Sequence, residues 1–177
     1  MPSLDVAVPF HENWYFDTVC EGIESGLRAV HPDAVVRVTT ERPGAEGRTV
    51  VTEVFDSALA DPDTLGAVAV GFQFRPSPVA RLAEHGKPVA VIGGTCAGLP
   101  SLSVDDERVA RNATQHLLAL GHASIAHLAG YALSPDDFTM RADRVRGYSE
   151  AMRDAGLDAS SHVVPCAFTH ELSLIHI

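Results

Sequence analysis

Residues 105–130 hold a helix pattern that runs directly into a strand pattern, and this junction constrains the fold of the whole chain. Apolar side chains recur here at helical spacing and are expected to form the buried face of a helix: Val109, Ala113, Leu117 and Leu120. Gly121 is a typical helix stop, and residues 124–128 are predicted to form a buried strand. A helix that ends in glycine and leads into such a strand is the repeating unit of a parallel α/β sheet.

Four predicted strands and three predicted helices alternate before this junction, whose own helix completes the fourth round. Short apolar runs predict strands at residues 4–9, 34–39, 66–71 and 88–92. Helices are predicted after the first three strands, at about 13–30, 51–59 and 77–86. The first helix carries an inward stripe at spacings of three and four: Phe16, Val19, Ile23, Leu27 and Val30. This alternation with short connections predicts the α/β class and a doubly wound parallel sheet.

A change of pattern near residue 104 indicates a domain boundary. The glycine-rich segment 93–100 is predicted to be a loop, and 101–104 a short extended piece. We expect an N-terminal subdomain over residues 1–104 and a partial C-terminal subdomain over 105–171. The latter has only two predicted strands, at 124–128 and 162–165, and two helices, from 106 and from about 139 to 155, which is about half of a Rossmann-like unit. Residues 172–177 fit neither pattern, and we expect this tail to be non-native.

The charge balance excludes one class of partner for these residues. The chain has 13 Lys and Arg residues against 23 Asp and Glu residues, which gives a net charge of −10. Proteins bind duplex DNA by neutralising phosphates with basic side chains, and no basic cluster occurs here. These residues therefore do not form a DNA-reading surface.

Other motifs that would assign the chain to a different class are missing from the sequence. No window approaches the ~18 apolar residues that span a bilayer, and no signal peptide is visible, so we expect a cytoplasmic protein with no membrane partner. The cysteines Cys20, Cys96 and Cys166 lack a Cys-x-x-Cys spacing, which argues against a zinc site and a disulfide framework. No metalloprotease, nucleophile-elbow or phosphate-loop motif occurs. We therefore expect no enzyme activity, no cofactor and no metal.

Candidate ligand contacts follow from the predicted sheet. In open α/β sheets, ligands bind beyond the carboxyl ends of the strands. Segments 10–16, 72–73 and 93–95 follow such ends, and the loop and helix start at 138–144 are expected to face them across the cleft. Asn13 fits either a helix cap or a ligand contact, and Phe16 either the core or a ligand contact. Trp14 and Tyr15 precede the apolar stripe and are expected to face the ligand, since aromatic rings stack on sugars and bases.

Three motifs occur in order along nearly the whole chain. The first is PFHENWYF at residues 9–16, followed by EGI at 21–23. The second is the pair Asp105-Asp106 with Ala113 and then HLLALGHASIAHLAG at 116–130. The third is RVRGYSEAM at 144–152. Together they resemble the effector-binding domain of the lactose-repressor (LacI/GalR) family of bacterial transcription regulators.

This resemblance implies a fold and a function. The fold would be two Rossmann-like subdomains with parallel sheets, of the periplasmic binding protein type I-like class, the second one incomplete here. A small-molecule effector, most often a sugar or related metabolite, would bind in the cleft between them. The chain would pair as a homodimer and would reach DNA only through a helix-turn-helix segment absent from this sequence. Effector binding would shift the population between two arrangements of the pair.

The resemblance also implies roles for particular residues. Tyr15 and Phe16 match positions where the family places aromatic rings against its ligand, and Arg144 matches a ligand-contacting arginine. The candidate ligand-binding residues are therefore Phe10, Asn13, Tyr15, Phe16, Gln73, Gly93 and Arg144. Position 93 departs from the family, which commonly has an aspartate there, so the effector is expected to be smaller, less polar or held by other groups.

One alternative shares the two-lobed fold. A solute-binding protein of a sugar uptake system of the ABC transporter type would bind a sugar in the same way. The missing signal peptide and the motif LGHxxIA at 120–126 favour the regulator.

Overall fold

The computed structural model describes residues 1–9, 13–40, 50–72, 84–96, 98–130 and 139–166. It divides into two compact units, Met1–Ser103 and Val104–Ile177, each with its own parallel sheet. Most of the predicted third helix and the tail at 172–177 lie outside the described residues. The predicted α/β class with parallel sheets is confirmed.

The first unit is a five-stranded parallel sheet in the order β2-β1-β3-β4-β5. Its strands are β1 (Ser3–Val8), β2 (Val35–Thr40), β3 (Thr64–Val70), β4 (Val89–Ile92) and β5 (Ser101–Leu102). The helices that lie wholly within its described residues are α1 (Trp14–Val30) and α2 (Val50–Ala60). The first four strands lie within two residues of their predicted bounds, and β5 falls in the stretch expected to be extended.

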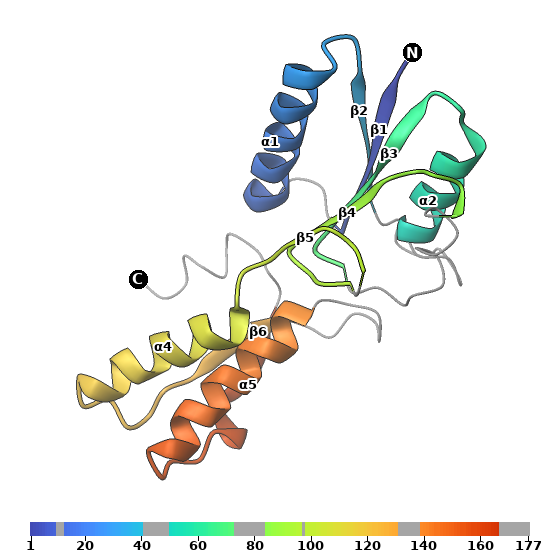
Figure 1. The fold of residues 1–177 in the computed structure, drawn as a ribbon. Helices are drawn as coiled ribbons and strands as arrows, with labels where there is room; N and C mark the ends of the chain where they lie inside the picture. Colours follow the sequence, from blue (N-terminus) through green and yellow to red (C-terminus); the bar gives the residue numbers. More distant parts are fainter. Residues whose placement is uncertain (10–12, 41–49, 73–83, 97, 131–138, 167–177) are drawn as a thin grey trace. The chain divides into compact units, whose positions relative to one another are not determined.

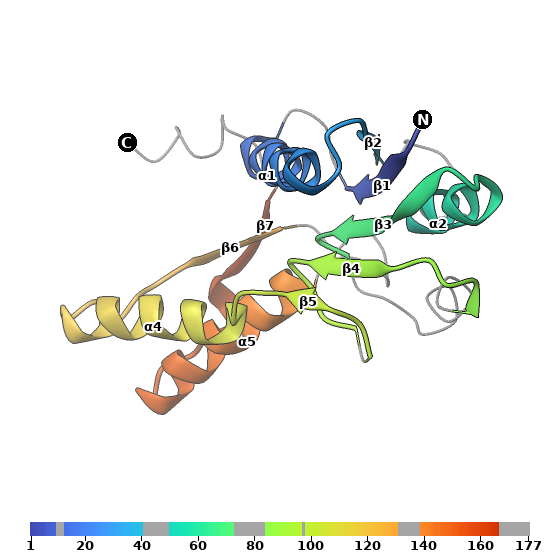
Figure 2. The same ribbon diagram turned by 45° about the horizontal axis from the view of Figure 1, so that its top comes forward.

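The two helices cover opposite faces of this sheet (Figure 1, Figure 2). The order β2-β1-β3 makes the chain cross over in opposite directions before and after β2, and right-handed crossovers then place α1 and α2 on opposite sides. Beneath α2 lies the main core cluster, made of Ala7, Val50, Val51, Val54, Phe55, Ala58, Ala67, Ala69, Phe72 and Val89. The alternate strand residues Val6, Val8 and Val70 are buried on the other face. The central strands are thus covered on both sides, as their small apolar residues predict.

Helix α1 begins at the predicted cap residue, but the last residue of its predicted inward stripe is exposed. The Asn13 side chain accepts a hydrogen bond from the Tyr15 backbone N–H at 3.0 Å, so the cap interpretation is confirmed. Phe16 is 4% exposed and belongs to the core. Val30 was expected on the inward stripe but is 70% exposed, because the helix has by then reached its last residue, beside the exposed turn at 31–33.

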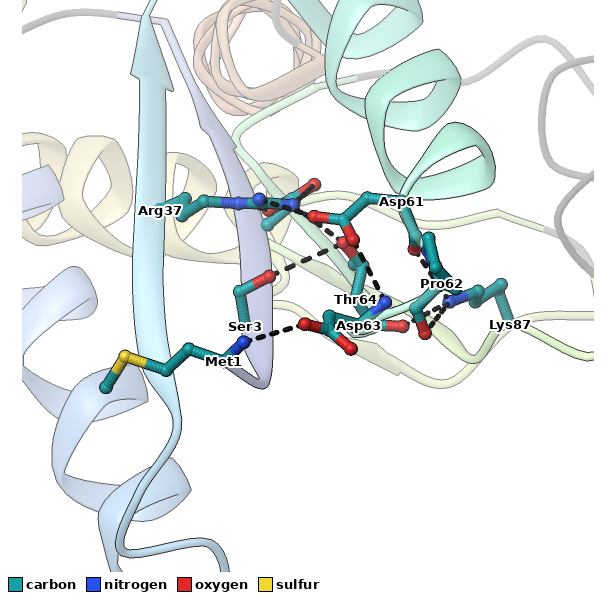
Figure 3. Close-up of polar contacts among 9 residues, drawn as sticks. Met1, Ser3, Arg37, Asp61, Pro62, Asp63, Thr64 and Lys87 are labelled. Atoms are coloured by element: carbon teal, nitrogen blue, oxygen red, sulfur yellow. Dashed lines mark hydrogen bonds and ion pairs between the residues drawn. The ribbon is translucent and has the colours of Figure 1, made fainter.

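Charged side chains gather toward the amino ends of β1, β2 and β3 (Figure 3). Arg37 on β2 lies beside Asp5 on β1 in the strand register, and its Nε donates to Asp5 Oδ1 at 2.6 Å. The Nη1 of Arg37 donates to Asp61 Oδ2 at 2.7 Å. Only 5% of the Asp5 side chain is exposed, so this carboxylate requires the counter-charge that Arg37 provides.

Lys87 holds the turn that connects α2 to β3 (Figure 3). Its Nζ donates to the backbone carbonyls of Asp61, Pro62 and Thr64. Within the same turn, the backbone N–H of Asp63 donates to Asp61 Oδ1 at 2.9 Å. Since Asp61 also bonds Arg37, the turn is tied both to the sheet and to the segment that precedes β4.

Within residues 104–130 and 139–166, the second unit has two parallel strands and two long helices. Its elements are α4 (Asp106–Ala119), β6 (His127–Gly130), α5 (Thr139–Asp154), the 3-10 turn Ser160–His162 and β7 (Val163–Cys166). The prediction of a strand at 124–128 was wrong in position by about three residues. Pairing with β7 fixes β6 at 127–130, whereas Ile125 is buried before the strand and its carbonyl accepts a hydrogen bond from Tyr148 Oη at 2.6 Å.

The predicted buried face of α4 was also wrong. Three of the four residues placed there are large and exposed: Val109 at 50%, Leu117 at 38% and Leu120 at 63%. Ala113 is exposed as well, and the buried residues of α4 are Asp106 and Thr114. The helix turns this other face to α5, with which it lies side by side (Figure 1, Figure 2).

Gly147 explains why α4 uses that face. A Cβ added at Gly147 would lie 2.0 Å from the Glu107 carbonyl oxygen and 3.0 Å from the Arg111 backbone nitrogen. The two helix backbones therefore touch at a point where no side chain would fit. Helix contacts of this kind select small residues, so apolar periodicity does not mark them.

Ion pairs flank the glycine contact between α4 and α5. Arg111 donates to Glu150 at 3.1 Å and to Asp154 at 2.5 Å, and Arg146 donates to Glu107. These side chains are 31–58% exposed, so each pair contributes little alone, at about 0–1 kcal/mol. Their common effect is to fix the register of the two helices.

Gly147→Ala is expected to destabilise the second unit strongly. The new methyl group cannot fit unless the helix backbones separate, and overpacking of this kind costs about 1–3 kcal/mol or more. Urea unfolding followed by circular dichroism measures the loss. Gly22→Ala in α1 is the matched control: nothing lies within 4 Å of its added Cβ, so stability should stay level or rise by about 0.5–1 kcal/mol. Equal effects of the two substitutions would contradict the close contact.

The Arg37–Asp61 pair is expected to contribute to acid sensitivity. The hydrogen bond from Arg37 lowers the pKa of Asp61, and the Asp63 N–H lowers it further. Because the folded-state pKa is depressed, the stabilisation is present above the unfolded pKa of about 4 and is lost as pH falls through the lower folded-state value. Asp61→Asn should therefore flatten the decline of the urea midpoint below about pH 4. Asp33→Asn, in the exposed turn after α1, should keep the wild-type slope.

Candidate ligand-binding site

The carboxyl ends of β1, β3 and β4 meet at one edge of the first sheet, where α1 begins. The register pairs Ala7 with Ala69 and Val70 with Ile92, so the three ends lie side by side. Tyr15, Phe16 and Gly93 of the predicted site are brought together here, beside the cap residue Asn13. Phe10 and Gln73 lie outside the described residues.

Two strand-end glycines make room for aromatic side chains of α1. Gly71 after β3 and Gly93 after β4 have φ values of +76° and +72°, a backbone region that side chains rarely adopt. A Cβ at Gly71 would lie 3.1 Å from Phe16 Cε1, and one at Gly93 would lie 3.3 Å from Tyr15 Oη. The backbone here is fixed, since the Gly71 N–H donates to the Ile92 carbonyl at 2.7 Å.

The three aromatic residues at the start of α1 form an aromatic cluster, Trp14, Tyr15 and Phe16. Their rings meet edge to face, with centroids 6.1 Å apart for the first two residues and 5.2 Å apart for the last two. Exposure falls along the cluster: Trp14 is 78% exposed, Tyr15 is half-buried and Phe16 is buried. Phe16 therefore anchors the cluster in the core, while Trp14 presents its indole to solvent.

Arg144 in the second unit is paired with a buried acid. Its Nε donates to Asp106 Oδ1 at 2.7 Å, and 42% of the Arg144 side chain is exposed against 9% for Asp106. Arg146 on the next face of α5 pairs with Glu107 and Asp143 instead. Asp106 thus orients the guanidinium of Arg144 next to the start of α4.

His127 lies close to the Arg144–Asp106 pair, and the charge of Arg144 affects its pKa. Its ring stacks on Tyr148 with centroids 5.1 Å apart. Burial lowers the pKa of His127, and the positive charges of Arg144 and Arg141 lower it further. The neutral form of the imidazole is therefore favoured, and the positive charge in this region comes from the arginines.

Asp106 is a candidate site residue that the sequence analysis did not include among the ligand contacts. The cap is Asp105, whose Oδ1 accepts from the Arg108 N–H at 2.9 Å. Asp106 is left to pair with Arg144. The sequence feature that could have indicated this role is the pair of adjacent aspartates at the helix start. One carboxylate is enough to cap the helix, so the other is available for a different partner.

A hollow of about 320 Å³ lies elsewhere on the first unit. It is lined by Gly86, Lys87, Pro88, Val89, Leu99 and Pro100. Val89 is the first residue of β4, so this hollow is at the amino end of that strand, away from the aromatic cluster. Lys87, its one charged side chain, is engaged with backbone carbonyls.

The described residues show no cluster of three or more His, Cys, Asp or Glu side chains placed to hold a metal ion. No helix in that part of the chain is both long and apolar enough to cross a membrane. The chemistry that the described groups offer is stacking, hydrogen bonding and charge pairing, which suits binding.

Comparison with known proteins relates this geometry to a family. Residues 73–170 match the family model described as periplasmic binding proteins and sugar binding domain of LacI family. The HTH-type transcriptional regulator CelR of Thermobifida fusca is 30% identical over 95 residues, which are 51% of this chain and 27% of that protein. Catabolite control protein A of Priestia megaterium is 32% identical over 74 residues, 41% of this chain and 21% of that protein.

Solved structures show the same fold. A LacI family transcriptional regulator from Silicibacter pomeroyi has a TM-score of 0.74 and 20% identity, covering 94% of this chain and 59% of its own. A complex of the transcriptional regulator CelR with cellobiose has a TM-score of 0.70 and 22% identity, covering 96% of this chain and 51% of its own. This chain therefore spans little more than half of these solved chains and about a quarter of the curated relatives. Since more than half of its residues match the one family model, the chain belongs to the family of periplasmic binding proteins and sugar-binding domains of LacI-family regulators.

Proposed function

We propose that this chain is the effector-binding core of a bacterial transcriptional regulator and binds a sugar or related small metabolite. The observation that carries the proposal is the aromatic cluster at the strand ends, in a chain of a sugar-binding family. The named relatives are regulators, and one structural neighbour is a complex with cellobiose. Their names do not describe enzymes.

The aromatic cluster suits the apolar face of a sugar. A pyranose ring presents C–H groups that pack on aromatic rings, and Trp14 offers such a ring with 78% of its surface exposed. An indole this exposed loses contact with water when a ligand covers it, which favours binding. Phe16 is buried beneath the cluster and fixes where the outer rings lie.

Arg144 and Asp106 suit sugar hydroxyls. A guanidinium donates in a fixed plane, and a carboxylate accepts, so together they match hydroxyl groups that both donate and accept. The ion pair holds both side chains before a ligand arrives, which reduces the entropy lost on binding. In the first unit the residues suited to a sugar are therefore Tyr15 and Trp14, and in the second unit they are Arg144 and Asp106.

Control of transcription would require a DNA-binding segment and a second copy of this protein. With a net charge of −10, these residues leave DNA contact to a basic helix-turn-helix segment outside this sequence. A homodimer in the cytoplasm is the arrangement that we propose, with effector binding shifting how the copies pair. The effector must then bind one arrangement better than the other.

A solute-binding protein of a sugar uptake system is the second candidate, because the matching family model includes periplasmic binding proteins. The coding sequence upstream of Met1 distinguishes the two: a basic helix-turn-helix segment supports the regulator, and a signal peptide supports the transport protein.

Trp14 provides a direct test of sugar binding, because it is the one tryptophan in these 177 residues. Titration with cellobiose, with glucose as a second probe, is expected to shift its fluorescence emission to shorter wavelength as the exposed indole is covered. Acrylamide quenching should fall at the same sugar concentrations. Unchanged emission and quenching at millimolar concentrations of both sugars would contradict a sugar site at this cluster.

Arg144→Lys is expected to weaken cellobiose binding about tenfold to a hundredfold in a calorimetric titration of the complete protein. Lysine keeps the positive charge beside Asp106 but loses the planar fork. Arg108→Lys is the matched control, because Arg108 pairs loosely with Asp105 at 3.6 Å and is 75% exposed. Wild-type affinity in Arg144→Lys would remove Arg144 from the site, whereas an equal loss in both variants would indicate a general effect of charge geometry.

A further inference from the structure

Gly93, at the end of β4, lies next to the hydroxyl of Tyr15. Gly93 has a φ of +72°, and its N–H donates to the Leu102 carbonyl at 2.8 Å, so its backbone is fixed. The nearest side-chain atom to the place of a Cβ there is Tyr15 Oη, at 3.3 Å. A side chain at position 93 would therefore crowd the hydroxyl of Tyr15 from α1.

Tyr15 is held in this place from three directions. Its backbone N–H donates to the Asn13 side chain, and its ring meets both the Phe16 ring and the Trp14 ring edge to face. Phe16 is itself buried against Gly71. The position of the hydroxyl thus follows from the cap and from the two strand-end glycines.

We propose that the Tyr15 hydroxyl is the polar group that the end of β4 presents to the effector, in place of a side chain at position 93. This inference rests on the proposed function. A carboxylate can only accept hydrogen bonds, whereas a tyrosine hydroxyl also donates and carries no charge. The site then takes a sugar that offers an acceptor oxygen at this point, such as a ring or glycosidic oxygen or a carboxylate. Residues 15 and 93 determine specificity together, because a larger side chain at either position would push away the side chain or backbone at the other.

The shared space can be tested without any ligand, by a double-mutant cycle. Gly93→Ala is strained by its positive φ in every background, but part of its cost comes from Tyr15 Oη. Tyr15→Phe removes that oxygen and keeps the ring. We expect Gly93→Ala to lower the melting temperature of the complete protein by about 2 °C less when Tyr15→Phe is also present. Equal losses in the two backgrounds would overturn the shared placement.

Calorimetric titration with cellobiose tests the contact itself. Tyr15→Phe is expected to weaken binding about three- to tenfold, the change for one neutral hydrogen bond. Tyr148→Phe deletes the same atom from a tyrosine whose hydroxyl donates to the buried Ile125 carbonyl, so it should lower stability and leave the affinity within twofold.

The outcomes separate the inference from the proposed function. Cellobiose that binds the wild type and Tyr15→Phe equally well overturns the role of Tyr15 and leaves the proposed function standing. Failure of the wild type to bind cellobiose or glucose overturns the sugar class in both proposals. The double-mutant cycle then still decides whether the hydroxyl occupies the place of residue 93.

Discussion

Burial of the central strands on both faces is the constraint on which the first unit depends. With α1 on one side and α2 on the other, β1 and β3 have no face to offer a ligand, and only the edges of the sheet remain. The two edges differ in chemistry. Toward the amino ends Arg37 and Lys87 bind carboxylates and carbonyls, while at the carboxyl ends the described residues bring glycines and aromatic rings together.

The sequence predicted most of this first unit because its signals are local. Alternation of strand and helix patterns, the Asn13 cap and the small residues of β3 each depend on nearby side chains, and each was confirmed. The aromatic residues were expected at the ligand edge for the same reason. The position of Tyr15 over Gly93 was not predicted, because residues nearly eighty positions apart come together only through the order of the strands.

The second unit was harder to predict because its two helices meet through a glycine contact and ion pairs as well as through an apolar cluster around Ile125, Tyr148 and Met152. Periodicity assigned Val109 and Leu117 to the buried face of α4, yet the helix packs through Thr114 and a bare stretch of backbone facing Gly147. Ion pairs surround the Gly147 contact, and a search for apolar periodicity does not detect ion pairs. The position of β6 was missed in a similar way, since an apolar run allows several registers and only β7 selects one.

The contact at Gly147 also has a mechanical consequence. Where backbones touch without intervening side chains, no flexible layer absorbs a displacement, so we expect α4 and α5 to move together as one rigid body. Arg144 lies less than one helical turn before this contact and is joined to Asp106 at the start of the other helix. The Arg144–Asp106 pair therefore joins the two helices a second time beside the glycine contact, so a displacement of either side chain would act on both helices at once.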